Sequence, residues 1–271
     1  MRIDYLSADI LLFRGDSLAA LATAFIDGER VLLVDALASQ YDAFDLRDYL
    51  ENTLHKRVEQ IVLTAADGSH AAAVPLFPEA QLTGALDAPE LIGWGRHTLA
   101  LHAEAGALQV DVPSADLQFV GDSIVGNIAT VGTFTPEQTD AHLARLQDRG
   151  RTRVVPRHTA AACSRALGNA RAYLAELGAR VRALRARFPA PDAAAAIARL
   201  PLDPLLPKGE FATPLEHHWH AENLKRIVER GLFPAATPQA AGERRGRART
   251  CCDTVGSVLM AMLGRLVERG V

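Results

Sequence analysis

The sequence contains little cysteine, little lysine and no long apolar run. Its three cysteines, two of them adjacent at Cys251 and Cys252, cannot form a disulfide framework or a spaced metal-binding knuckle, so a reducing cytoplasm is the expected compartment. No stretch reaches the roughly 18 consecutive apolar residues that a membrane span requires. The first nine residues carry Asp4 and Asp9 and lack the basic and apolar regions of a secretory signal. We therefore expect a soluble chain that contacts no membrane.

Positive charge does not exceed negative charge in this sequence. Lysine and arginine number 29 against 32 aspartates and glutamates, and the net charge of −3 excludes a basic field over the whole protein for nucleic acid. The hydrophobic fraction of 49% is that of a globular protein, and the 271 residues suffice for one large domain or two small ones. Lysine occurs only at positions 56, 208 and 225, and this preference for arginine suggests a GC-rich bacterial coding sequence. We expect a small-molecule substrate or ligand and no nucleic-acid partner.

The first part of the chain alternates short apolar runs with turn residues such as Asp27 and Gly28, which is typical of strands. The predicted strands are Ile10–Phe13, Ala20–Ile26, Val31–Asp35, Gln60–Leu63, Leu99–Leu101, Leu108–Val112, Leu117–Val120 and Arg153–Pro156. Helical spacing predicts a helix over Tyr41–Lys56, with Phe44, Tyr49, Leu50 and Leu54 on its buried side.

Three further helices are predicted in the second half of the sequence. They are Pro136–Asp148, Cys163–Phe188 and Pro214–Arg230, the last opened by a capping box at Thr213 and Glu216. Residues 1–234 are expected to form one domain. Residues 235–250 are rich in Ala, Gly, Pro and Arg and indicate a linker. Residues 251–271 predict an amphipathic helix whose apolar side needs a partner, either this domain or a second subunit in a homodimer.

Acidic and imidazole side chains follow three of the predicted strands. Asp67, Ser69 and His70 lie after the strand at 60–63, Asp122 follows Gly121 after the strand at 117–120, and His158 follows the strand at 153–156. Strand ends of this kind can converge on one edge of a sheet. The pattern suggests a metal site or a catalytic pair there.

In this order, the segments resemble the metallo-β-lactamase fold superfamily over most of residues 10 to 160. The matching segments are the early strand Val31–Asp35, the loop Leu63–His70 in place of HxHxDH, Leu76–Ala80 in place of LFPxA, Phe119–Asp122 in place of FxGD, and Val154–His158 in place of VxPGH. The resemblance implies an α+β fold, a four-layer αβ/βα sandwich in which two mixed sheets pack face to face with helices outside.

The chain departs from the family pattern at several ligand positions. Within the HxHxDH loop it carries Ala65, Asp67 and Ser69, so the usual dinuclear zinc centre is incomplete. His102 approaches the family's middle histidine but lies one residue out of register. Arg157 replaces the glycine before the last histidine, which crowds that ligand or places a positive charge beside it.

The residues retained from the family pattern all belong to its second metal position. The resemblance implies that His70, Asp122 and His158 hold one divalent ion, zinc rather than iron, whose bound water would supply hydroxide for hydrolysis of a substrate that the sequence does not identify. Asp67 is a fourth ligand or the general base for that water.

Two other functions stay open at this point. A catalytically silent relative could retain the scaffold to bind a ligand or partner, with no metal at all, because Ala65 and Ser69 remove ligands. Iron-based chemistry is a further alternative, since two histidines and one carboxylate suit Fe(II). His102, Ser69 and His220 are secondary site candidates. His220 lies in a loose His-x-x-Asn match to some family branches, and its apolar helix face favours a packed side chain.

Overall fold

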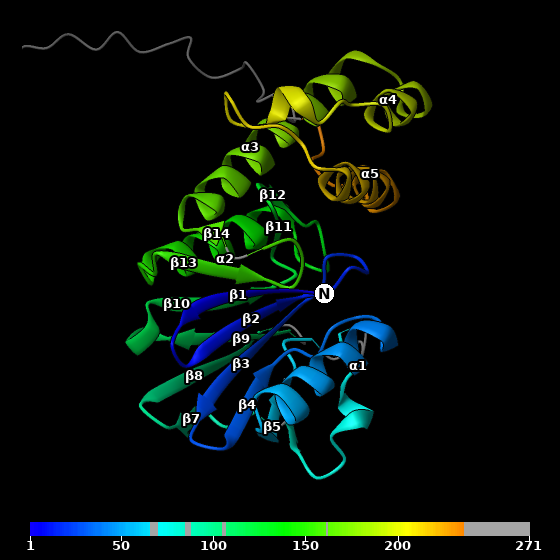
Figure 1. Cartoon of the computed structure of the whole chain (residues 1–271). Coiled ribbons are helices and arrows are strands. Elements are labelled where there is room, and N and C mark those ends of the chain that lie inside the picture. The colour runs from blue at the N-terminus through cyan, green and yellow to red at the C-terminus, as the bar shows by residue number, and fades with distance from the viewer. Residues whose placement is uncertain (66–69, 85–87, 105–106, 161, 236–271) are drawn as a thin grey trace, which may run out of the picture. The chain divides into compact units, whose positions relative to one another are not determined.

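Two mixed sheets pack face to face in the computed structural model, with helices on their outer sides (Figure 1). The structure describes residues 1–235 except 66–69, 85–87, 105–106 and 161. Residues Met1–Ala235 form one unit. The predicted helix at 251–271 and nearly all of the predicted linker lie outside the described residues, as do Asp67 and Ser69.

The first sheet contains the N-terminal strands in sequence order. Its members are β1 (Arg2–Ser7), β2 (Ile10–Arg14), β3 (Leu21–Asp27), β4 (Arg30–Val34), β5 (Arg57–Val62) and β6 (Gln81–Thr83). The first four strands are antiparallel, and β4, β5 and β6 are parallel. A parallel pair needs a crossover, which for β4 and β5 contains helix α1 (Gln40–Asp48) and the π-helical turn Tyr49–Thr53.

The second sheet has the order β14-β13-β10-β9-β8-β7. Its strands are β7 (Leu91–Trp94), β8 (His97–Glu104), β9 (Ala107–Val112), β10 (Leu117–Gly121), β13 (Arg153–Pro156) and β14 (Ala162–Cys163). Only β10 and β13 are parallel among these described strands, and helix α2 (Pro136–Asp148) lies in the crossover between them. The short hairpin of β11 (Ile124–Val125) and β12 (Ile128–Ala129) follows β10.

Alternating apolar side chains build the layers. Along β2, Ile10 and Leu12 pack between the two sheets, whereas Leu11 and Phe13 pack on the side of α1. Phe25 of the first sheet meets Phe119 of the second, with ring centroids 6.0 Å apart. The order helix, sheet, sheet, helix is the predicted four-layer α+β sandwich, and that prediction is confirmed.

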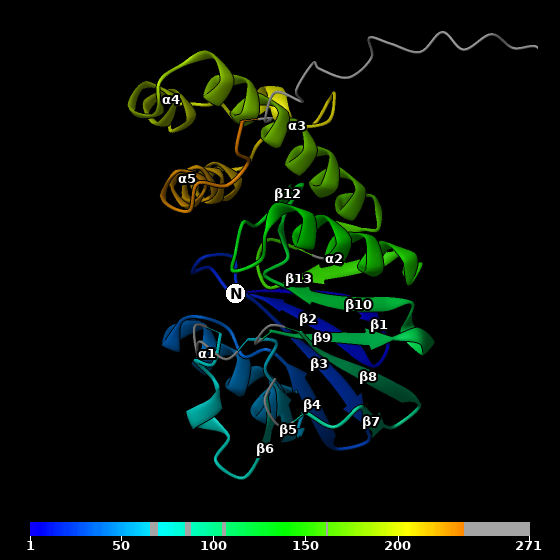
Figure 2. The same ribbon diagram turned by 180° about the vertical axis from the view of Figure 1, so that it is seen from behind.

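The outer helical layer of the second sheet is larger than that of the first (Figure 2). Beyond α2 it contains α3 (Arg165–Arg187), α4 (Ala190–Ile197) and α5 (Pro214–Glu229). Short 3₁₀ turns occur at Val74–Leu76, Pro113–Ala115 and Asp203–Leu205. The predicted capping box at Thr213 and Glu216 is present at the start of α5. No helix in the described ranges has the length and apolar character needed to cross a lipid bilayer.

The structure differs from the sequence prediction in several local elements. Strands β1 and β7 and helix α4 were not predicted, because their exposed or alanine-rich sequences carry weak periodicity. Phe44, predicted to be buried, is 47% exposed. Leu50 is buried as predicted, and Ala43 and Leu46 take the place of Phe44 on the buried face of this segment.

Glycine at position 126 is required by the β11–β12 turn, and its replacement tests the packing of α5 on that turn. Gly126 has φ +58°, and an added Cβ would lie 2.6 Å from Cδ of the buried Glu216. We expect Gly126→Ala to lower the free energy of unfolding by about 3 kcal/mol, because backbone strain and overpacking add. Urea denaturation measures this loss.

Gly28→Ala is the matched control, since Gly28 has φ +59° and no atom within 4 Å of the added Cβ. It should cost only about 1 kcal/mol. Equal losses in the two variants would contradict the packing of Glu216 against the turn.

Candidate functional site

The C-terminal ends of four strands meet where the two sheets join. Asp35 follows β4, Thr64 lies after β5, Asp122 follows β10 and Arg157 follows β13. The backbone N–H of Arg157 donates to Gly121 at 3.0 Å, within the second sheet. The carbonyl of the same residue accepts a bond of 2.9 Å from the start of β3 in the first sheet. This cross-sheet bond fixes the ends of the two sheets against each other.

His70 and His158 lie side by side at this junction. Both are buried, and their rings are perpendicular with centroids 4.6 Å apart. Nδ1 of His158 lies 3.0 Å from the carbonyl oxygen of Leu18, which can only accept, so Nδ1 carries the proton. Nε2 of His158 lies 3.8 Å from Oδ1 of Asp122. The structure thus brings His158 next to His70 and Asp122, two of the other predicted ligands.

Arg157 places a buried positive charge on the Asp122 carboxylate. The Arg157 side chain is 1% exposed, and its Nη1 donates to Oδ2 of Asp122. Its charge also acts on Asp35, so the guanidinium lies near two carboxylates at the strand ends. Arginine in place of the family's glycine was predicted to crowd the last histidine or to place a charge there. The structure shows the second outcome, because the Arg157 guanidinium lies on Asp122, next to His158.

Asp35 is a site residue that the sequence reasoning did not select. It is 5% exposed, and Thr64 donates to it from its backbone nitrogen at 2.9 Å and from its hydroxyl at 2.8 Å. Burial raises the pKa of Asp35 to about 6, although Arg157 and Thr64 oppose the shift, and the charge of Asp122 adds to it. The available signal was its position at the end of the strand Val31–Asp35.

The described residues do not fit a metal ion well. No group of three His, Cys, Asp or Glu side chains within the described ranges is arranged to hold one. The fixed guanidinium of Arg157 already occupies one oxygen of Asp122 and repels a second cation nearby. Asp67, the predicted fourth ligand and general base, and Ser69 lie outside the described residues.

The other two secondary candidates lie elsewhere. His102 lies on β8 and is largely exposed, and partial desolvation of its ring, followed by the charge of Arg149, lowers its pKa. His220 is buried in the helical layer, with Nε2 donating to the Leu200 carbonyl at 2.9 Å and Nδ1 2.8 Å from the Tyr173 hydroxyl. Among the described contacts, neither histidine meets His70, Asp122 or His158.

A cavity of about 460 Å³ opens beside Asp122. Its lining includes Trp219, whose ring centroid lies 6.0 Å from that of His158, and Arg226. Its polar wall is formed by Glu104, Ser123 and His142, which the prediction did not identify as site residues. The sequence offered little signal for them, because they come from β8, the end of β10 and α2.

Comparison with solved structures supports the fold. No family model and no curated protein matches the chain. A metallo-β-lactamase from Pontibacter korlensis matches with a TM-score of 0.55 and 15% identity, covering 64% of this chain and 98% of that one. The crystal structure of VMB-1 at pH 5.5 matches with a TM-score of 0.52 and 13% identity, covering 65% and 96%. The chain has the metallo-β-lactamase fold, as its motifs predicted.

Asp35→Asn tests the buried carboxylate. Because the pKa of Asp35 is about 6 in the folded protein against an ordinary 3.8, the folded state binds more protons between these values, and the free energy of unfolding falls as pH rises through them. Asparagine does not ionise, so it removes this loss of stability at higher pH, and it tolerates the left-handed φ of 59° at position 35. The free energy of unfolding of the variant minus that of wild type should therefore be about 2 kcal/mol more positive at pH 8 than at pH 4.5.

Urea denaturation at the two pH values measures this difference. The exposed Asp4→Asn variant controls for the loss of one negative charge. A stability difference between Asp35→Asn and wild type that does not change with pH would contradict the pKa of Asp35.

Proposed function

We propose that this chain is a metal-independent member of its fold, in which Arg157 takes the place of a metal ion and the neighbouring cavity binds a small organic molecule. The observation that carries the proposal is the buried guanidinium of Arg157 on Asp122. A buried charge needs a compensating partner, and the buried guanidinium of Arg157 pairs with Asp122, which is partly exposed, and acts on the buried carboxylate of Asp35. The site then remains folded without a divalent ion.

The cavity favours a ligand with an apolar ring and a negatively charged group. Trp219 and Phe134 supply aromatic surface in its wall. The Arg226 guanidinium lies 5.8 Å from the Trp219 ring centroid and donates to the carbonyl of Val131 at 2.9 Å. Arg226 has no acidic partner within the described part of the chain, so its charge is available for a carboxylate ligand.

A single-metal hydrolase is the second candidate, with zinc or iron on His70, Asp122 and His158. It is favoured by the orientation of His158, whose protonated Nδ1 is fixed by Leu18 so that Nε2 faces Asp122. Oδ1 of Asp122 is buried and accepts no hydrogen bond from the described residues. This hypothesis requires Arg157 to yield its place beside Asp122.

Metal content separates the two candidates. We expect protein purified without chelator to contain well under one zinc or iron per chain by elemental analysis, and its melting temperature to be unchanged by EDTA. Arg157→Gly should lose about 3–5 kcal/mol of stability, because carboxylates are left without their cation. Added zinc should restore part of this loss by taking the place of the guanidinium.

Arg153→Ala is the matched control, because the guanidinium of Arg153 is likewise held by hydrogen bonds, to the carbonyl oxygens of Leu6 and Ala115, but contacts neither Asp122 nor Asp35 in the described structure. Its stability loss should not respond to zinc. One metal per wild-type chain, lost in His158→Ala, would overturn the proposal and favour the second candidate.

Ligand binding is measured with 2-naphthoate, an aromatic carboxylate. The chain has two tryptophans, so Trp94→Phe leaves Trp219 in the cavity wall as the reporter. We expect saturable quenching of its fluorescence, and affinity about tenfold lower after Arg226→Ala, because a charge-assisted hydrogen bond is lost. Lys225→Ala, at an exposed position on the same helix, should leave the affinity unchanged. Quenching that never saturates would contradict the cavity as a ligand site.

A further inference from the structure

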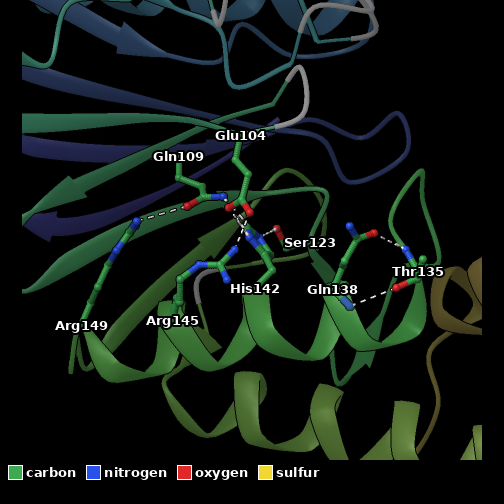
Figure 3. A network of polar contacts seen from close by, with 8 residues as sticks. All are labelled: Glu104, Gln109, Ser123, Thr135, Gln138, His142, Arg145 and Arg149. Atoms are coloured by element: carbon green, nitrogen blue, oxygen red, sulfur yellow. Dashed lines mark hydrogen bonds and ion pairs between the residues drawn. The ribbon is translucent and has the colours of Figure 1, made fainter.

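A serine, a histidine and a glutamate form a continuous hydrogen-bonded chain in the wall of the cavity (Figure 3). Oγ of Ser123 lies 2.9 Å from Nε2 of His142. Nδ1 of the same imidazole lies 2.8 Å from Oε2 of Glu104. This is the spatial order of nucleophile, base and orienting carboxylate that acyl-transfer enzymes use on unrelated folds.

The charges around His142 select the tautomer that this chemistry needs. Glu104 also bonds Arg145, and although burial raises the pKa of this carboxyl, its bond to His142 and the neighbouring positive charges lower it overall. An ionised carboxylate accepts the Nδ1 proton, so Nε2 presents its lone pair to Ser123. Burial lowers the pKa of His142, and although the bond to Glu104 and its negative charge oppose this shift, Arg145 and Arg149 add to it and the pKa stays below the ordinary value. The imidazole is therefore neutral at pH 7, as a base must be.

Gln109 supplies a donor beside the reacting atoms. Arg149 donates to Oε1 of Gln109 at 3.2 Å, which fixes the amide so that Nε2 faces the imidazole. That Nε2 lies 3.2 Å from Nε2 of His142, farther than the serine hydroxyl. An N–H group in this position can donate to the oxygen of a bound carbonyl group.

We propose that Ser123, His142 and Glu104 form a serine-hydrolase triad that cleaves small carboxylic esters in this cavity. The inference rests on the proposed function only in using the same cavity as the ligand site. Glu104 acts as a positioning residue, and Ser123 and His142 are the catalytic residues. The activity needs no metal ion.

The reaction balances without a further reactant except water. Oγ of Ser123 attacks the ester carbonyl while its proton passes to Nε2 of His142, and the alcohol leaves with that proton as its C–O bond breaks. Water then attacks the acyl-serine and gives a proton to the imidazole. The carboxylic acid leaves, and Oγ recovers its proton.

A second chain of the same kind shows what the cavity adds. Oγ of Ser114 lies 2.8 Å from Nδ1 of His97, whose Nε2 lies 3.0 Å from Oδ2 of Asp9. Ser114 is exposed and does not line the cavity beside Asp122. Both sets of three residues therefore share the hydrogen bonds, but only Ser123 faces the cavity. Ser114 is thus an internal control for serine reactivity.

The test uses p-nitrophenyl butyrate and an alkyl fluorophosphonate, both with EDTA present. We expect EDTA-resistant hydrolysis that falls at least about 100-fold in Ser123→Ala and in His142→Gln, and stays at the wild-type rate in Ser114→Ala. Glu104→Gln should lower kcat more than it raises KM, because the imidazole loses its orientation. The rate should rise with pH through a pKa below the usual histidine range.

The fluorophosphonate forms a P–O bond to a reactive serine and releases fluoride, so intact mass and peptide mapping locate the modified residue. We expect one added group, on Ser123. Labelling at Ser114, no labelling at all, or hydrolysis that Ser123→Ala leaves intact would overturn the triad, even if 2-naphthoate still binds and the chain is metal-free. Hydrolysis abolished by EDTA would overturn it in favour of the metal site. Unchanged melting temperatures show that each variant is folded.

Discussion

The contact between the Arg157 guanidinium and the Asp122 carboxylate is the interaction on which the arrangement of the strand ends depends. Arg157 follows a strand of the second sheet, and its backbone carbonyl accepts a bond from the first sheet. Its side chain also offsets the buried charge of Asp35. One residue therefore joins the two sheets through its backbone and compensates their acidic ends through its side chain. A metal ion performs comparable charge compensation where carboxylates and imidazoles surround it.

In the proposed function, Arg157 takes the place of a metal ion at the strand ends, and a cavity lies beside it. With a cation supplied by the chain, the histidines at 70 and 158 form a buried contact that helps to pack the junction. The cavity next to Asp122 has an aromatic wall, a cation at Arg226 and polar groups at Ser123 and His142. Chemistry based on the polar groups depends on Glu104 of β8, Ser123 after β10 and His142 of α2, none of which the family motifs include.

The sequence predicted the sandwich well, because its strands carry strong apolar runs and its strand-end motifs are spaced as in the family. Strand Arg153–Pro156 and helix Pro136–Asp148 were predicted with the observed bounds. Proximity of His158 to Asp122 followed from the motifs as well. The relation of Glu104 to His142 could not be predicted, because 38 residues separate them and neither lies in a motif. The contact of Arg157 with Asp122 also needed the tertiary structure, because the sequence does not show which partner the guanidinium of a long side chain contacts.

The capping glutamate of α5 links two elements that are distant in the chain. Oε2 of Glu216 accepts hydrogen bonds from the backbone and hydroxyl of Thr213, while Oε1 accepts the backbone N–H of Asn127 in the β11–β12 turn at 2.8 Å. Unwinding the first turn of α5 therefore releases the hairpin that follows Ser123. Slow exchange of the Asn127 amide hydrogen with solvent would then report on the opening of a helix nearly ninety residues further along the chain.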